Sequence, residues 1–127
     1  IKPDAVERDL QGKIKEKFKN NSFKIIKEKK IHITKTEAED FYRVHESKPF
    51  YEDLCNYLSS GPIIVMILEK ESAVTENRKL MGATDPVEAE SGTIRGDLGT
   101  EMPENLIHGS DSEESAKREI SIFFPEL

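Results

Sequence analysis

The most continuous apolar run in the chain, Ile63 to Leu68, constrains the fold more than any other segment. It contains six apolar residues in succession, several of them β-branched, and Glu69 follows it. A run of this length and composition predicts a central strand that is covered on both faces. Ser60-Gly61-Pro62 is a turn signal immediately before it, so we expect the strand to extend from Pro62 to Glu69.

The other segments show the spacing of helices and of half-buried strands. Apolar residues three and four apart predict helices over residues 10–20, after a cap at Thr34 or Thr36, over 51–59 and over 72–81. Imperfect alternation predicts a strand over residues 23–33, with a bulge near 27–30. Ile1 is expected to end another strand, and a fourth is expected to end at His108. This order predicts an α+β fold, a ferredoxin-like four-stranded antiparallel sheet with helices packed on it.

Residues 83–105 lack the periodicity of a helix or strand. The segment is rich in Gly and Pro and leaves room for at most one short helical turn. Loops of more than 20 residues inside a compact domain are usually functional or disordered, and the embedded G-T-I-R-G-D favours a functional loop.

Length and composition predict one globular domain over residues 1–127. The net charge of −6 argues against broad binding of nucleic acid, and no apolar run approaches the roughly 20 residues of a membrane span. The single cysteine, Cys55, cannot form an internal disulfide, which favours a cytoplasmic location. The chain begins Ile-Lys-Pro-Asp, and we expect the first strand to be truncated in this sequence.

The stretch from Asn105 to Glu119 carries the clearest candidate for chemistry. His108 ends a short apolar run, and the good N-cap residues Ser110, Asp111 and Ser112 follow it. Both Ser110-x-x-Glu113 and Asp111-x-x-Glu114 have the spacing of a capping box. Glu119 falls at the border of the buried face of the helix that follows, where it could point back to His108. A histidine oriented by a carboxylate beside a helix N-terminus suits a nucleophile that holds an anionic group. The alternative is a histidine packed at a strand end without chemistry.

The same stretch, N-L-I-H-G-S-D-S-x-x-S-A-x-x-E, resembles the active-site signature of nucleoside diphosphate kinases. Five further blocks occur in the order of that family: I-K-P-D-A-V, K-P-F-Y-E-D-L, S-G-P, R-K-L-M-G-A-T-D-P and G-T-I-R-G-D-L. The resemblance implies an enzyme that moves the γ-phosphoryl group of a nucleoside triphosphate, mainly ATP, to a nucleoside diphosphate. It implies a ping-pong mechanism through phosphorylated His108, with little base specificity, and the ferredoxin-like fold.

The resemblance also implies the roles of individual residues. Lys2, Arg78 and Arg95 would converge on the phosphates with the Thr84 hydroxyl, and Phe50 would stack on the base. The remaining positions are Asn105 on the sugar and phosphate side, Glu119 and Ser110 beside His108, and Tyr42 and Leu54 as supporting residues. Mg²⁺ is expected on the substrate phosphates, with Asp111 as a candidate for contact through water and no direct protein ligand.

Two departures and one alternative accompany this interpretation. Asp85 stands where many members have asparagine, and Glu104 where a basic residue is frequent; neither alters a central catalytic position. The alternative is a catalytically silent module that binds nucleotide or protein, for which loss of His108 or Lys2 would be the signature.

The family implies a homo-oligomer, and we expect a hexamer rather than a tetramer, with the loop 83–105 contributing to the assembly.

Overall fold

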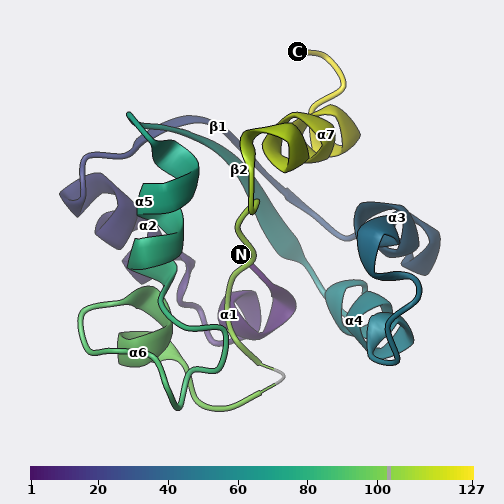
Figure 1. Cartoon of the computed structure of the whole chain (residues 1–127), viewed down its shortest axis with the longest axis horizontal. Coiled ribbons are helices and arrows are strands. Elements are labelled where there is room, and N and C mark those ends of the chain that lie inside the picture. The colour runs from purple at the N-terminus through teal and green to yellow at the C-terminus, as the bar shows by residue number, and fades with distance from the viewer. Residues whose placement is uncertain (103) are drawn as a thin grey trace.

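The computed structural model describes residues 1–102 and 104–127 (Figure 1). Its sheet consists of β1 (Lys24–Ile31) and β2 (Ile63–Glu69), which pair antiparallel. Lys24 lies opposite Glu69 at one end of the ladder and Ile31 opposite Ile63 at the other. The register shifts between Ile25 and Lys27, so the predicted bulge exists but lies at Ile26, just before the expected place.

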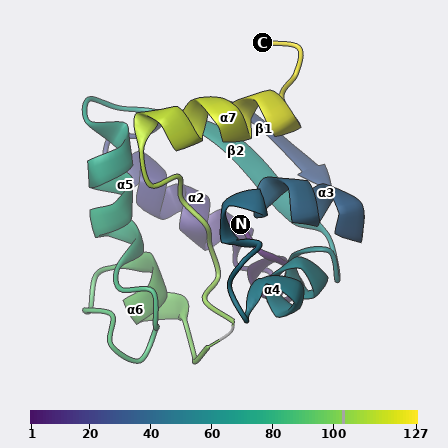
Figure 2. The same cartoon turned by 45° about the vertical axis from the view of Figure 1, so that its right-hand side comes forward.

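Seven α-helices and one 3-10 turn surround the strands in the described residues. They are α1 (Pro3–Glu7), α2 (Gln11–Asn20), α3 (Lys35–Phe41), η1 (Arg43–His45), α4 (Tyr51–Leu58), α5 (Ala73–Met81), α6 (Ile94–Leu98) and α7 (Glu113–Phe123). Helices α2, α5 and α6 lie at one end of the strand pair and α3 and α4 at the other, while α7 crosses over it (Figures 1 and 2). Within the parts of the chain described here, no helix has the length and apolar character needed to cross a bilayer.

The prediction of four strands is wrong for the described residues, which form two. The two remaining segments are extended and lie in the expected places, but each makes too few bonds to form a ladder. Ile1 exchanges a pair of backbone hydrogen bonds with Ile64 on β2, and Lys2 N donates to Leu106 O at 2.8 Å. The chain then enters α1 at Pro3, and Leu106 has a φ of +70°, which interrupts extended backbone.

The predicted central strand is confirmed as β2, although it is not covered on both faces along its whole length. Ile63 and Ile64 are buried, whereas the residues from Val65 to Leu68 are half-buried. The helices predicted over residues 10–20, 51–59 and 72–81 are confirmed within one residue at each end as α2, α4 and α5. The helix expected to begin after Thr34 or Thr36 and to stop at Pro49 ends at Phe41 instead, with the 3-10 turn η1 behind it, and α1 was not expected.

Two predicted caps need correction. Thr34, and not Thr36, caps α3 in a capping box with Glu37. Ser112 caps α7 by accepting from Ser115 N, so the boxes expected from Ser110 and Asp111 are not the ones that form. The reason is that α7 begins one or two residues later than those spacings require, and this leaves Ser110 free for another partner.

The buried apolar residues form two clusters. The first gathers residues of α1, α2, α5 and α6 with Leu106 and Ile107: Ala5, Leu10, Ile14, Phe18, Phe23, Met81, Ile94, Leu106 and Ile107. The second gathers α3, α4 and the start of β2: Ile33, Ala38, Phe41, Tyr42, Cys55, Leu58 and Ile63. Ile122 and Phe123 of α7 pack against the second cluster, so this helix closes it from one side.

Candidate active site

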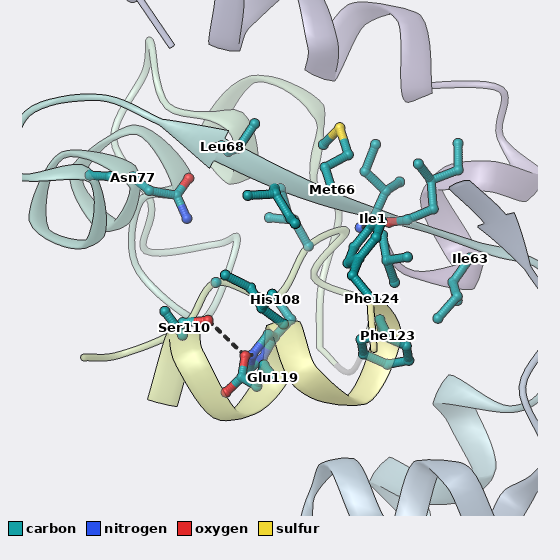
Figure 3. Close-up of a pocket in the computed structure, with 18 of the residues that line it drawn as sticks. Ile1, Ile63, Met66, Leu68, Asn77, His108, Ser110, Glu119, Phe123 and Phe124 are labelled. Carbon is teal, nitrogen blue, oxygen red and sulfur yellow. Dashed lines mark hydrogen bonds and ion pairs between the residues drawn. The ribbon is translucent and has the colours of Figure 1, made fainter. Parts of the chain in front are cut away.

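His108, Ser110 and Glu119 form the centre of the candidate site (Figure 3). The Nε2 atom of His108 lies 2.8 Å from Oε1 of Glu119. The Ser110 hydroxyl donates to the same carboxylate oxygen, also at 2.8 Å. The structure therefore brings together the histidine and the two partners that the sequence suggested for it.

The partners of Glu119 indicate which nitrogen of His108 is available. An ionised carboxylate only accepts hydrogen bonds, so Nε2 must be the nitrogen that carries the proton. In a neutral imidazole the other nitrogen, Nδ1, then has a free lone pair. The His108 side chain is 32% exposed and that of Glu119 17%, so a substrate atom can reach the ring while the carboxylate stays largely shielded.

A tight backbone turn precedes His108. Leu106 is fully buried and has a φ of +70°, and Ile107 N donates to Asn105 O at 2.8 Å across it. A bond between residues i and i+2 with positive φ defines the rarer, strained form of the γ-turn. Gly109 follows on the other side, in close contact with α5: a Cβ atom there would lie 2.5 Å from both Asn77 Nδ2 and Met81 Sδ. The path of the chain on both sides of His108 is thus closely determined.

Lys2 and Asn105 form the first part of the cationic side of the site. Both are buried, and Lys2 Nζ donates to Asn105 Oδ1 at 2.7 Å. Asn105 Nδ2 in turn donates to Thr84 O at 3.1 Å, which connects the loop to this pair. Burial lowers the pKa of the Lys2 ammonium to about 8, with the nearby charge of Arg95 as a second cause.

Arg95, predicted as a phosphate-binding residue of the loop, lies beneath the surface and contacts the backbone. It is buried, and its guanidinium donates to three backbone carbonyls: Asn105 at 3.1 Å, Gly82 at 3.1 Å and Ile107 at 2.6 Å. Burial, followed by the charge of Arg78, lowers its pKa to about 10, so it remains charged at neutral pH. Arg95 therefore fixes the backbone around the γ-turn and contributes a positive charge from beneath it.

Arg78 lies on α5 with its side chain exposed, and its Nη1 donates to Gly109 O at 3.3 Å. This contact places its guanidinium beside the residue that follows His108. Thr84 is also exposed, and its backbone carbonyl accepts from Asn105 Nδ2.

Aromatic rings connect His108 to the predicted base-stacking residue. The Tyr42 ring centroid lies 6.1 Å from that of His108 and 6.2 Å from His45, and His45 lies 5.9 Å from Phe50. Phe50 is 47% exposed, unlike an ordinary core phenylalanine. Leu54, one turn further along α4, is partly buried against the second apolar cluster. Phe50 thus lies at the open end of a row of rings that begins at His108.

Asp111 is exposed and lies just before α7. Its hydrogen bond with the Ser115 side chain is the main cause that lowers its pKa, and the charge of Arg78 contributes. In residues 1–102 and 104–127, no group of three or more His, Cys, Asp or Glu side chains is arranged to bind a metal ion.

An apolar cavity of about 200 Å³ lies on one side of the site (Figure 3). His108, Ser110 and Glu119 form part of its wall, opposite apolar residues of β2 such as Met66 and Leu68. Of the predicted nucleophile and nucleotide residues, its lining includes His108 and Lys2 but not Phe50, Arg78, Thr84, Arg95 or Asn105. This cavity is therefore not where the predicted nucleotide-binding residues gather.

Sequence reasoning missed two residues that fix the two sides of the site. The Phe41 ring lies 4.8 Å from the His108 ring in an edge contact. Arg118, next to Glu119, donates to the backbone carbonyls of Asp40 and Phe41 and so fixes α7 against α3. The helical spacing of Phe41 predicted burial but could not identify its neighbour. Arg118 had no signal beyond a charge on a helix.

Comparison with known proteins identifies the family of the chain. The family model described as nucleoside diphosphate kinase matches residues 1–127. The nucleoside diphosphate kinases of Geotalea uraniireducens and Geobacter sulfurreducens are 55% and 54% identical to the whole chain, which covers 93% of each.

Two solved structures extend the comparison to the fold. The Aquifex aeolicus nucleoside diphosphate kinase superposes with a TM-score of 0.95 at 40% identity, over 98% of this chain and 90% of that one. The enzyme from Halobacterium salinarum, solved in complex with CDP, gives a TM-score of 0.92 at 42% identity, over 98% and 83%. With its complete match to the family model and these relatives, the chain belongs to the nucleoside diphosphate kinase family.

Proposed function

We propose that His108 is the nucleophile of this kinase and carries the phosphoryl group between two nucleotides. The observation that supports this most directly is the bond from His108 Nε2 to Glu119, which leaves Nδ1 with a free lone pair. Nδ1 attacks the γ-phosphorus of a nucleoside triphosphate, a P–N bond forms, and the bond to the bridging oxygen breaks. The diphosphate leaves with that electron pair.

The second half of the reaction reverses these steps with another nucleotide. A terminal oxygen of the incoming diphosphate attacks phosphorus, the P–N bond breaks, and its electron pair returns to Nδ1. The proton on Nε2 stays in place throughout, because the ring gains positive charge when Nδ1 is phosphorylated and Glu119 stabilises that charge. Ser110 orients the carboxylate through its own hydrogen bond.

Charge on the moving phosphoryl group is balanced by cations on one side of His108. Phosphoryl transfer depends on positioning and on neutralising the equatorial oxygens. Lys2 supplies a buried point charge, Arg78 an exposed guanidinium beside Gly109, and Arg95 a buried charge beneath the turn. Asn105 contacts the nucleotide after exchanging its bond with Lys2, and the Thr84 hydroxyl reaches a phosphate oxygen.

Phe50 stacks on the nucleobase, with Tyr42 and Leu54 as supporting residues behind it. Stacking on a ring face discriminates little among bases, since every base has such a face. The exposure of Phe50 and its place at the end of the ring row support this role. The CDP complex of the Halobacterium salinarum relative supports a nucleoside diphosphate as ligand.

Mg²⁺ accompanies the nucleotide and, when bound, neutralises charge on the β- and γ-phosphates. Asp111, an exposed carboxylate with a lowered pKa, would hold the ion through a water molecule, and no protein side chain would be a direct ligand.

Trapping the intermediate tests the role of His108. The protein is incubated with magnesium and γ-labelled ATP, freed of nucleotide, and then chased with GDP or CDP. We expect label that is acid-labile and alkali-stable and that passes to either acceptor. His108→Asn should take no label and lose turnover, whereas the control His32→Asn, an exposed histidine bonded to Ser59 O, should behave as the wild type. Turnover by His108→Asn would overturn the proposal.

The silent binding module is the less favoured function. Both His108 and Lys2 are present, and the partners of His108 are arranged as a nucleophile requires. Nucleotide bound without any transfer of label would favour this alternative.

The functional protein is a homo-oligomer in the cytoplasm, and a hexamer rather than a tetramer. β1 has a ladder partner on one side only within the described residues, and an open edge invites pairing with another copy. The loop carries Val87, 73% exposed, and Met102, 48% exposed, which suits contact with other subunits. Cys55 is a free, buried thiol, in keeping with a reducing compartment. Native mass spectrometry distinguishes six copies from four.

A further inference from the structure

The γ-turn at Leu106 requires an explanation, because leucine rarely adopts a positive φ. The turn is two residues from His108, and it directs both the Asn105 side chain and the backbone of His108. Any relaxation of Leu106 toward negative φ would therefore move the nucleophile away from the cations. Something in the surrounding structure must keep the turn in place.

Asp4 contacts the turn directly. Its carboxylate is 3% exposed, and Oδ2 accepts from Leu106 N at 3.1 Å. Leu106 O accepts from Lys2 N at 2.8 Å, so residues 2–4 satisfy both backbone polar groups of Leu106. Asp4 lies in the first turn of α1, where an acidic residue also interacts favourably with the helix N-terminus. The buried Asp4 carboxylate thus accepts a hydrogen bond from the backbone beside the nucleophile.

Tyr57 completes the arrangement from α4. Its hydroxyl donates to Oδ1 of Asp4, the oxygen not used by Leu106. Burial and this bond to Asp4 raise the pKa of Tyr57, so the phenol stays protonated and remains a donor. A chain of two hydrogen bonds therefore runs from α4 through α1 to the γ-turn.

We propose that Asp4 and Tyr57 are positioning residues for the phosphoryl transfer: the Tyr57 hydroxyl orients the Asp4 carboxylate, which keeps Leu106 in the γ-turn and so aligns His108 with the phosphates. This inference rests on the proposed role of His108. Neither residue touches the substrate, and both act through the backbone of Leu106.

The test measures the rate of phosphohistidine formation at saturating γ-labelled ATP in a single turnover. Tyr57→Phe should slow this step by about 3- to 10-fold, the effect of one hydrogen bond. Asp4→Asn should slow it by about 10- to 100-fold, because small misplacement of a reacting group has effects of that size. The double variant should be no slower than Asp4→Asn alone, since Tyr57 acts only through Asp4.

Tyr51→Phe is the matched control. Tyr51 lies on the same helix, and its hydroxyl donates to Glu39 O at 2.9 Å, so the substitution also removes one part-buried hydrogen bond. It should lower the unfolding midpoint about as much as Tyr57→Phe but leave the rate unchanged. The amide proton shift of Leu106, measured by NMR, should move in Asp4→Asn and in Tyr57→Phe and not in Tyr51→Phe.

The possible failures are distinguishable. A wild-type protein that takes no label overturns the role of His108 and the positioning role with it. If the wild type takes label but Tyr57→Phe forms phosphohistidine at the wild-type rate, only the positioning role is overturned. The same holds if Tyr51→Phe slows this step as much as Tyr57→Phe does. An unchanged Leu106 amide shift in Asp4→Asn does the same.

Discussion

The bond between His108 and Glu119 gives the most direct test of how the site activates its nucleophile. In Glu119→Gln the side chain keeps its size, and its amide oxygen can still accept from Nε2 at a similar distance to the present 2.8 Å. A hydrogen bond to a charged group contributes about 1.5–3 kcal/mol and a neutral one about 0.5–1.5 kcal/mol. The substitution should therefore remove about 1–1.5 kcal/mol of stabilisation from the charged phosphorylated ring, or about tenfold in rate.

Glu119→Ala should have a larger effect, because the whole bond is lost and the Ser110 hydroxyl also loses its acceptor. The loss of about 1.5–3 kcal/mol corresponds to roughly 10- to 150-fold. Quenched-flow measurement of phosphohistidine formation gives the rate, and calorimetry with ADP separates it from nucleotide affinity. Glu114→Gln, an exposed residue of the same helix, controls for the loss of charge near the α7 N-terminus. A Glu119→Gln rate within twofold of the wild type, or an equal loss in Glu114→Gln, would refute the reasoning.

Four further outcomes follow from the geometry. Lys2 loses its charge as the pH rises through its pKa of about 8, so kcat/KM should fall above that pH. Lys2→Arg should show no such fall up to pH 10. The same fall of kcat/KM in Lys2→Arg would contradict the assignment to Lys2. Because the folded pKa of Lys2 lies below the unfolded value, its contribution to stability should rise with pH from about 8 to 10.5, opposite to activity, as measured by urea unfolding. Phe50→Ala should raise the KM of purine and pyrimidine nucleotides alike through the loss of about 1–3 kcal/mol of stacking, and a loss confined to one base class would disprove stacking as its role. Gly109→Ala should lower both the unfolding midpoint and the rate, because its Cβ would lie 2.5 Å from Met81 Sδ; an unchanged midpoint would show that α5 can move aside.

The sequence predicted the contact between His108 and Glu119 better than it predicted the sheet. Helical periodicity located five helices and placed Glu119 at the face that meets His108, because that contact depends on local spacing along one helix. The number of strands depended on pairing between distant segments. Ile1 pairs with Ile64 of β2 and Leu106 with Lys2, but each pairing has only one or two backbone bonds, and no pattern in the sequence reveals how many bonds form.

Arg95 illustrates what residue type alone could not reveal. An arginine beside glycine in a loop suggests a ligand, yet its guanidinium donates to three carbonyls of its own chain. Asp4 gave no such signal, because it was expected only to follow the strand that ends at Ile1, and α1 was not expected. Its bond to Leu106 joins residues 102 positions apart. The bond matters because Leu106 has a positive φ, and the identity of a residue as leucine does not indicate a positive φ.

The two apolar clusters meet at the nucleophile. Leu106 and Ile107 belong to the cluster beneath Lys2 and Arg95, while the ring of His108 packs against Phe41 of the other cluster. The reacting nitrogen therefore takes its backbone position from one half of the molecule and its ring orientation from the other. On heating, a small displacement of one apolar cluster relative to the other should abolish catalysis while the helices of both clusters remain folded. We expect the enzyme to lose turnover several degrees below the temperature at which its circular dichroism signal melts, and to recover turnover on cooling. Activity would then report on the contact between the two apolar clusters.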